Sequence, residues 1–328
     1  MGDTAYAAPV VASRFAHKIH PAHDALYEYS KRSCARSLDE LAAGEEVSHN
    51  GAFAACGGSY VACVYPDGEL ERLKVVADCY SAWVFIDDLI DNTTDMAYVS
   101  DMVTSLRRRV AGAGAGAGVG PDDDEDDGFD WMLRLFRHAA WHPKALRLTR
   151  AEIDRFLECT VVLRAIESAA RPVSVDEYLR LRAANSAMGV MYAVMAFAAP
   201  RLADELLRLS AAAPEALRRV FTCSGVSIGI LLDLYKVNGE HPQRCDYTNV
   251  ARILRRSARL TLPQAVDAAV DLFHQYEARL ALALDEVAAA SPALARAMER
   301  LHAGSVVWLA AMRGGRYVRT VDCDRDSC

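Results

Sequence analysis

The chain has 328 residues with a formal net charge of −7, and 52% of the residues are hydrophobic. This apolar content is enough to build a large core, and the acidic balance argues against a partner that is nucleic acid. No run of eighteen apolar residues indicates a transmembrane helix, so we expect no integral membrane contact. Residues 1–20 lack the charged start and apolar run of a signal peptide, and the nine scattered cysteines suit a reduced, cytoplasmic protein.

Apolar residues recur with helical spacing along almost the whole chain, and no alternating strand pattern is apparent. We therefore expect one all-α domain over residues 1–328. Prolines mark most of the breaks between helices. The predicted helices, in chain order, cover residues 24–44, 69–92, 95–111, 129–140, 143–168, 174–198, 200–212, 214–238, 247–257, 261–289 and 291–314.

Three segments fall outside these helices. We expect residues 1–20 to be mobile. His17 and His20 lie at the end of this segment and His23 lies just after it, and Pro21 interrupts any rigid zinc-binding frame that the three histidines could form. The glycine-rich and acidic residues 112–128 predict a disordered surface loop. Residues 319–328 are expected to form a tail.

A cluster of aspartates ends the helix predicted over residues 69–92. The helix is apolar nearly all round before it reaches Asp87, Asp88 and Asp91, which indicates that it is buried. Asp87 and Asp91 are one turn apart on the same face, and Asp88 lies about 100° round the helix. Mg²⁺ prefers carboxylate and phosphate oxygens, so this spacing predicts a site for Mg²⁺ and a phosphate-bearing substrate. The alternative is a solvated helix end, which the helix macrodipole disfavours for acids.

Four segments in order along the chain resemble the microbial class I terpene synthases. Before the aspartates, Tyr65-Pro66, Leu73 and the Trp83-Val84-Phe85 triplet are similar to residues that precede D-D-x-x-D in that family. The segments HPAHDALYEYSKRS, DEYLRLRAANSAMGVMY and VVWLAAMRGGRYVR resemble three further parts of it, so the resemblance runs from about residue 20 to residue 318. It implies an α-helical bundle around a deep apolar cavity.

The resemblance also implies roles for the polar residues. Asp87 and Asp88 would coordinate Mg²⁺, of which the family uses three, with Asp91 close by. The helix that carries the diphosphate-sensing arginine matches the segment around Arg182, and Arg180 is the alternative for that role. The family breaks this helix a few residues later to present a backbone carbonyl to the substrate, and Asn185, Ser186 and Gly189 fall there.

The remaining candidates belong to the diphosphate site and the cavity wall. In the family an Arg-Tyr pair closes over the diphosphate, which here implies Arg316 and Tyr317. Aromatic side chains can stabilise carbocations through their π faces. The substrate-binding residues that we expect are Phe53, Trp83, Phe85, Ser186, Tyr192 and Trp308. The implied reaction is Mg²⁺-assisted cyclisation of a linear prenyl diphosphate, farnesyl diphosphate above all, and the family also implies a homodimer.

The second metal motif of the family, N-D-x-x-S-x-x-x-E, is altered here. Aligned on Asp233, its asparagine is Leu232, its serine is Lys236 and its glutamate is Glu240. Leucine has no lone pair, and lysine is only a donor. Two explanations stay open: Lys236 neutralises the diphosphate directly, or the site has decayed into that of an inactive homologue that binds a ligand or partner. A chain-elongating prenyltransferase ranks lower, because it should carry a second D-D-x-x-D.

Overall fold

The computed structural model describes residues 9–41, 57–113, 130–237 and 246–312, and all regular structure within these ranges is helical. The predicted all-α fold is confirmed. The described elements are α1 (His23–Leu41), α3 (Gly57–Val64), α4 (Leu70–Asn92), α5 (Met96–Gly112), α6 (Asp130–Arg137), α7 (Pro143–Ser168), α8 (Val175–Asn185), α9 (Met188–Ala198), η1 (Pro200–Leu202), α10 (Ala203–Ala212), α11 (Pro214–Lys236), α12 (Val250–Ser257), α13 (Leu262–Ala290) and α14 (Pro292–Met312).

The helix boundaries follow local chemistry that the sequence carries. Proline occupies the first turn of α7, α11 and α13, where its missing N–H leaves no bond unmade. Asp95, Ser174 and Asn249 cap the starts of α5, α8 and α12 with side-chain oxygens. Thr261 and Gln264 form a reciprocal capping box at the start of α13. Each of the eleven predicted helices begins within three residues of an observed one.

Sequence patterning missed α3, a short helix whose eight residues are all buried. It has no polar face, so it shows no amphipathic period. Gly57 and Gly58 explain how it fits between its neighbours, because a Cβ at Gly57 would lie 2.3 Å from Ser81 Oγ and one at Gly58 would lie 2.0 Å from the Leu26 carbonyl oxygen. The two glycines thus let α3 lie directly against α1 and α4.

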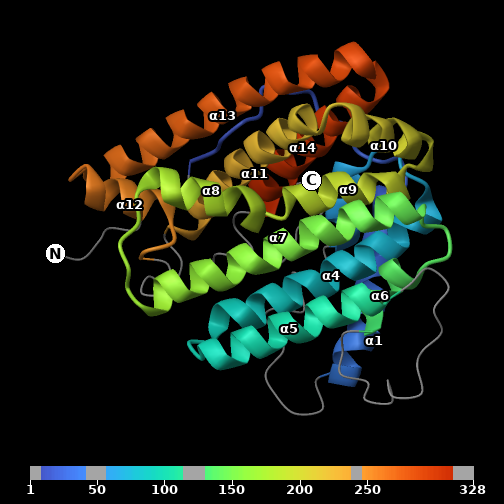
Figure 1. The fold of residues 1–328 in the computed structure, drawn as a ribbon, viewed down its shortest axis with the longest axis horizontal. Coiled ribbons are helices and arrows are strands. Elements are labelled where there is room, and N and C mark those ends of the chain that lie inside the picture. Colours follow the sequence, from blue (N-terminus) through green and yellow to red (C-terminus); the bar gives the residue numbers. More distant parts are fainter. Residues whose placement is uncertain (1–8, 42–56, 114–129, 238–245, 313–328) are drawn as a thin grey trace.

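The helices pack around a central group of elements that carry the candidate site. In Figure 1, α13 lies along one edge of the molecule and α5 along the opposite edge, with α4, α7, α8 and α11 between them. α11 packs most extensively on α13 and also contacts α8, α9 and α14. No single described helix is long and apolar enough to cross a membrane. The bent pair Val175–Ala198 and Pro200–Ala212 reaches that length and apolar content only when its two parts are taken together.

The described part of the chain before α1, residues 9–20, contacts the bundle at several points, and the mobility expected of residues 1–20 stays a prediction. Val11 and His20 are buried. His20 Nε2 lies 3.2 Å from the Gly68 carbonyl oxygen, and Ser13 Oγ donates to Glu277 Oε1 at 2.7 Å. Residues 42–56, 114–129, 238–245 and 313–328 lie outside the described residues, as do most of the predicted loop at 112–128 and the tail at 319–328.

Glu277 is the centre of a buried polar network that ties this N-terminal segment to four helices, α9, α11, α13 and α14. Its carboxylate lies 3.1 Å from His302 Nε2, and His302 Nδ1 lies 2.9 Å from Ser224 Oγ. Tyr192 donates to Ser224 at 2.9 Å. Burial alone would raise the pKa of Glu277, but hydrogen bonds from His302 and Ser13 hold it below the ordinary carboxyl value. Glu277 and His302 are fully buried, so this group is structural.

We predict that Glu277→Gln lowers the free energy of unfolding by about 1–3 kcal/mol near pH 7, the scale of hydrogen bonds to a charged group. Because the folded pKa of Glu277 is depressed, its contribution is complete above about pH 4.3, the ordinary glutamate value, and is lost as the pH falls through the folded pKa. Thermal melts from pH 7 to pH 3 should show that the difference in melting temperature between wild type and variant becomes smaller as the pH falls. A constant gap would contradict this account.

Candidate active site

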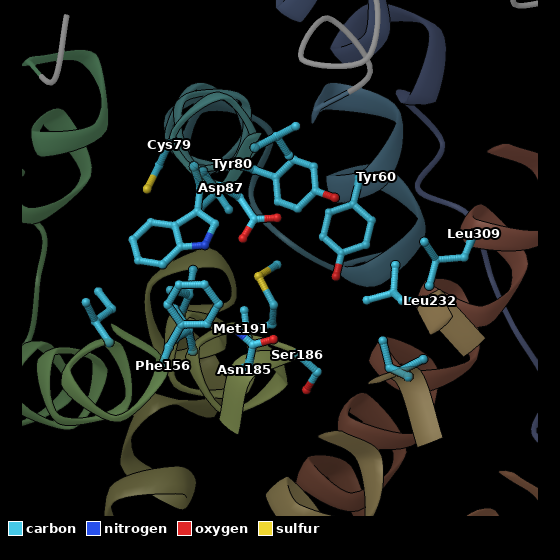
Figure 2. A pocket seen from close by; sticks show the side chains of 18 of the residues that line it. Tyr60, Cys79, Tyr80, Asp87, Phe156, Asn185, Ser186, Met191, Leu232 and Leu309 are labelled. Atoms are coloured by element: carbon cyan, nitrogen blue, oxygen red, sulfur yellow. The ribbon is translucent and has the colours of Figure 1, made fainter. Parts of the chain in front are cut away.

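The acidic end of α4 borders a cavity in the middle of the bundle. Asp87 and Asp91 both line this cavity, as the one-turn spacing predicts. The preceding turns of α4 bury Ala82, Val84 and Ile86, which fixes the rotation of the helix and so directs the two carboxylates inward. Figure 2 shows the Asp87 carboxylate pointing toward the middle of the pocket. The side chains of Asp88 and Phe85 lie outside the described part of the chain.

The cavity measures about 1200 Å³, counting the space that opens to solvent, and its deep part is apolar and aromatic. The rings of Tyr60 and Tyr80 stack with centroids 4.1 Å apart, and Trp308 meets Tyr60 edge-on at 4.9 Å. On the other side, Trp83 and Phe156 lie 4.8 Å apart. A pocket with π faces on several sides suits an apolar or cationic hydrocarbon.

Three of the six predicted substrate-binding residues line the cavity: Trp83, Ser186 and Trp308. Tyr192 does not. It is fully buried behind the wall, stacks on Phe221 with centroids 5.2 Å apart and donates to Ser224. Helical period alone cannot separate a wall residue from the core residue behind it. Phe53 lies outside the described residues.

The predicted break in the helix at 174–198 is present between α8 and α9. Ala187 takes the left-handed conformation with φ 59°, which is costly for a residue with a Cβ. Asn185, Ser186 and Ala187 all line the cavity, and Figure 2 shows Asn185 and Ser186 across the pocket from Asp87. Asn185 Nδ2 donates to Thr160 Oγ1 at 2.8 Å, which anchors the break to α7.

Arg182 lies just before this break and is paired with Asp233 of α11. Arg182 Nη2 is 3.1 Å from Asp233 Oδ1, and Nη1 donates to Asn185 Oδ1 at 2.6 Å. Both members of the pair are buried, whereas Arg180, the alternative, is exposed. Burial lowers the pKa of Arg182, but the charge of Asp233, with smaller influences from Asp87 and Asp91, outweighs this and raises it. The guanidinium therefore stays protonated beside the acidic end of α4.

The Asp233 carboxylate makes three contacts within the protein. Its Oδ2 accepts from the Tyr178 hydroxyl at 2.7 Å and from the Val250 backbone N–H at 3.0 Å, in addition to the ion pair through Oδ1. Burial raises the pKa of Asp233, and Arg182 gives the largest opposing effect. These three contacts use most of the roughly four lone-pair sites of the carboxylate, so little is left for a metal ion.

Two glycines let α8 lie directly on α11. A Cβ at Gly225 would lie 2.1 Å from the Ala183 carbonyl oxygen, and one at Gly229 would lie 2.5 Å from Arg182 Cγ. The glycines are one turn apart on the same face of α11. Arg182 can therefore lie flat across this face and reach Asp233 while it still lines the cavity.

Lys236, at the end of α11, faces the acidic end of α4. Its Nζ lies 3.3 Å from Asp91 Oδ2, and both residues line the cavity together with Leu232. The lysine in place of the motif's serine and the leucine in place of its asparagine therefore both face the site. Glu240, Arg316 and Tyr317 lie outside the described residues.

Several residues that shape the site gave no separate signal in the sequence. Tyr60 and Phe156 line the cavity, and Tyr178 and Asn249 brace Asp233. In the sequence alone, each of these residues has the pattern of an ordinary core or helix-capping residue. Their roles arise only from the approach of helices that are distant in sequence.

An all-helical bundle around an apolar cavity, with carboxylates and cations at the cavity mouth, is the architecture of the class I terpene synthases. The chain belongs to this family: the model of terpene synthase family 2, C-terminal metal binding, matches residues 78–279, which is more than half of the chain. The matched segment contains the C-terminal part of α4 and all of α8 and α11, the three helices that carry the polar residues of the site.

Solved structures show the same fold. SVS_A2, a protein from ancestral sequence reconstruction, has a TM-score of 0.75 and 15% identity over 94% of this chain and 90% of its own. Apo hedycaryol synthase has a TM-score of 0.67 and 18% identity over 95% of this chain and 99% of its own. Hedycaryol synthase in complex with nerolidol has a TM-score of 0.61 and 16% identity over 96% and 100%. No curated protein sequence matches the chain.

We predict that Asp233→Asn destabilises the fold by about 3–5 kcal/mol, because it leaves the Arg182 guanidinium buried without its opposite charge. Asp101→Asn is the matched control, since Asp101 is an exposed aspartate on α5. Urea unfolding of the three proteins measures the difference. Equal loss of stability in both variants, or none in either, would show that the pair is not the structural element we describe.

Proposed function

We propose that the protein ionises and cyclises a linear prenyl diphosphate, with farnesyl diphosphate as the substrate, in a Mg²⁺-dependent reaction. The observation that carries this is the division of the cavity into two parts. Its mouth holds carboxylates and cations, and its interior is lined by aromatic and aliphatic side chains. A substrate with an anionic head and a hydrocarbon tail fits that division. Farnesyl diphosphate follows from the resemblance to sesquiterpene synthases.

The residues on α4 fit Mg²⁺, and those on α11 do not. Asp87 and Asp91 line the mouth and offer the hard oxygen ligands that Mg²⁺ prefers. On α11, Leu232 offers no ligand, Asp233 is occupied by Arg182, Tyr178 and Val250, and Lys236 is a cation. Among the described residues, no group of three or more His, Cys, Asp or Glu side chains is placed to hold a metal. When bound, Mg²⁺ would neutralise negative charge on the diphosphate.

The chain's own residues support the remaining chemistry. In the proposed reaction the C–O bond to the diphosphate breaks, its electron pair leaves with the diphosphate, and an allylic carbocation remains. Arg182 and Lys236 lie where they can bind the anion as its charge grows, and Arg316 and Tyr317 are assigned the same role by resemblance. The aromatic wall stabilises the carbocation and excludes water until the ring closes. Loss of a proton or addition of water then gives a hydrocarbon or an alcohol.

One alternative rests on a specific observation. Because α11 lacks the ligands of the second metal motif, a catalytically inactive homologue would show the same structure and would bind a ligand or partner in the cavity. A chain-elongating prenyltransferase is less well supported, because the one aspartate at the corresponding position, Asp233, is buried in an ion pair.

We predict that purified protein with Mg²⁺ and farnesyl diphosphate releases inorganic diphosphate and a volatile terpene. Geranyl and geranylgeranyl diphosphate serve as parallel substrates, and gas chromatography with a diphosphate assay provides the readout. An Asp87→Ala, Asp88→Ala double variant should lose at least ~100-fold in rate, the scale of removing one strong electrostatic stabiliser. A well-folded wild type that releases neither product favours the inactive homologue.

A further inference from the structure

A second, polar pocket adjoins the mouth of the apolar cavity, between α7, α8, α11 and the residues before α12. We name it the polar annex. It measures about 490 Å³, again counting the space that opens to solvent. Its lining is mostly hydrogen-bonding side chains, and it shares four residues with the apolar cavity: Asp91, Arg182, Asn185 and Lys236. An anion bound in the annex would therefore lie directly beside a hydrocarbon tail bound in the cavity.

Three cations from three helices line the annex. Lys236 comes from α11, Arg182 from α8 and Arg164 from α7. Arg164 was not among the residues that the sequence singled out. Its Nη2 donates to the carbonyl oxygen of Thr93, the C-cap residue that follows α4, so it fixes the acidic end of that helix.

Two of these cations keep unused donors deep in the protein. Arg164 is 8% exposed and Arg182 is 7% exposed. Within the described part of the chain, neither Nε has a hydrogen-bond partner. A buried guanidinium N–H without a partner is costly. Both arginines line the annex, so an anion bound there would lie beside two buried guanidinium groups.

Lys236 occupies the position where the family pattern places a metal ligand. Its Nζ lies 3.3 Å from Asp91 Oδ2, so the lysine places a fixed positive charge against the acidic end of α4. An ammonium has three donors and can hold a carboxylate and a phosphate oxygen together. A lysine here thus supplies charge where serine would have helped to bind a metal ion.

We propose that the polar annex binds the diphosphate group and that Lys236, with Arg164 and Arg182, supplies there the positive charge that an α11-bound metal would otherwise provide. The proposal deepens the function proposed above and rests on it for the identity of the substrate. It makes diphosphate binding partly independent of divalent metal. It also explains the substitution at position 232, because an apolar side chain can line the cavity where no metal needs a ligand.

The test measures binding of inorganic diphosphate to the full-length protein by calorimetry, first in EDTA and then in Mg²⁺. We expect the wild type to bind in EDTA. Lys236→Gln should weaken that binding by about tenfold or more, the scale of one charge-assisted hydrogen bond, and Arg164→Gln should act in the same direction. Lys144→Gln is the matched control and should bind like wild type, since Lys144 is exposed at the other end of α7 from Arg164. Circular dichroism melts confirm that each variant is folded.

A second variant keeps the proposal open to contradiction if Lys236→Gln fails to fold. Lys236→Arg retains the charge and should retain most binding in EDTA. Wild-type binding that requires Mg²⁺, or that is equally strong in folded Lys236→Gln, overturns the proposal. The proposed function can fail separately. If diphosphate binds in EDTA through Lys236 but no terpene forms, the annex proposal holds and the proposed cyclase activity is contradicted. Terpene formation without Lys236-dependent diphosphate binding supports the cyclase and overturns the proposal for the annex.

Discussion

The buried ion pair between Arg182 and Asp233 determines how the other parts of the site are arranged. It joins α8 to α11 across a face that Gly225 and Gly229 keep flat. It also orders the start of α12, because Asp233 accepts from the Val250 N–H. A buried pair of this kind is strongly destabilising to break, so it fixes the relative position of its two helices. Since Arg182 also lines the cavity, the same pair places a permanent cation at the mouth.

The mouth is therefore a balance of opposed fixed charges. Asp87 and Asp91 approach from α4, and Arg182 and Lys236 face them from α8 and α11. Behind the mouth, the wall is made mostly of aromatic and aliphatic side chains. In the proposed reaction, the charge that leaves with the diphosphate would meet cations, and the charge left on the hydrocarbon would meet π faces. This separation follows from helix packing and requires no special backbone beyond the break at Ala187.

The sequence predicted the parts of this site that are local. The all-α fold, most helix boundaries, the one-turn spacing of Asp87 and Asp91 and the break near Ser186 all follow from period, caps and short motifs. It did not predict α3, which is apolar on every side, or the packing of residues 9–20 against Glu277. Nor did it separate Tyr192 from the wall or identify Arg164. Such roles depend on contacts between helices far apart in sequence, which no local pattern encodes.

The central claim is that α11 presents the positive charge of Lys236 to the substrate head group, at the position where the second metal motif of the terpene synthases has a metal ligand. A crystal structure with Mn²⁺ and inorganic diphosphate tests it most directly, because anomalous scattering locates each metal ion. We predict metal at the acidic end of α4 beside Asp87, no metal ligated by α11, and Lys236 Nζ within hydrogen-bond distance of a diphosphate oxygen. A metal ion bound through α11, with Lys236 turned away from the diphosphate, would contradict the account.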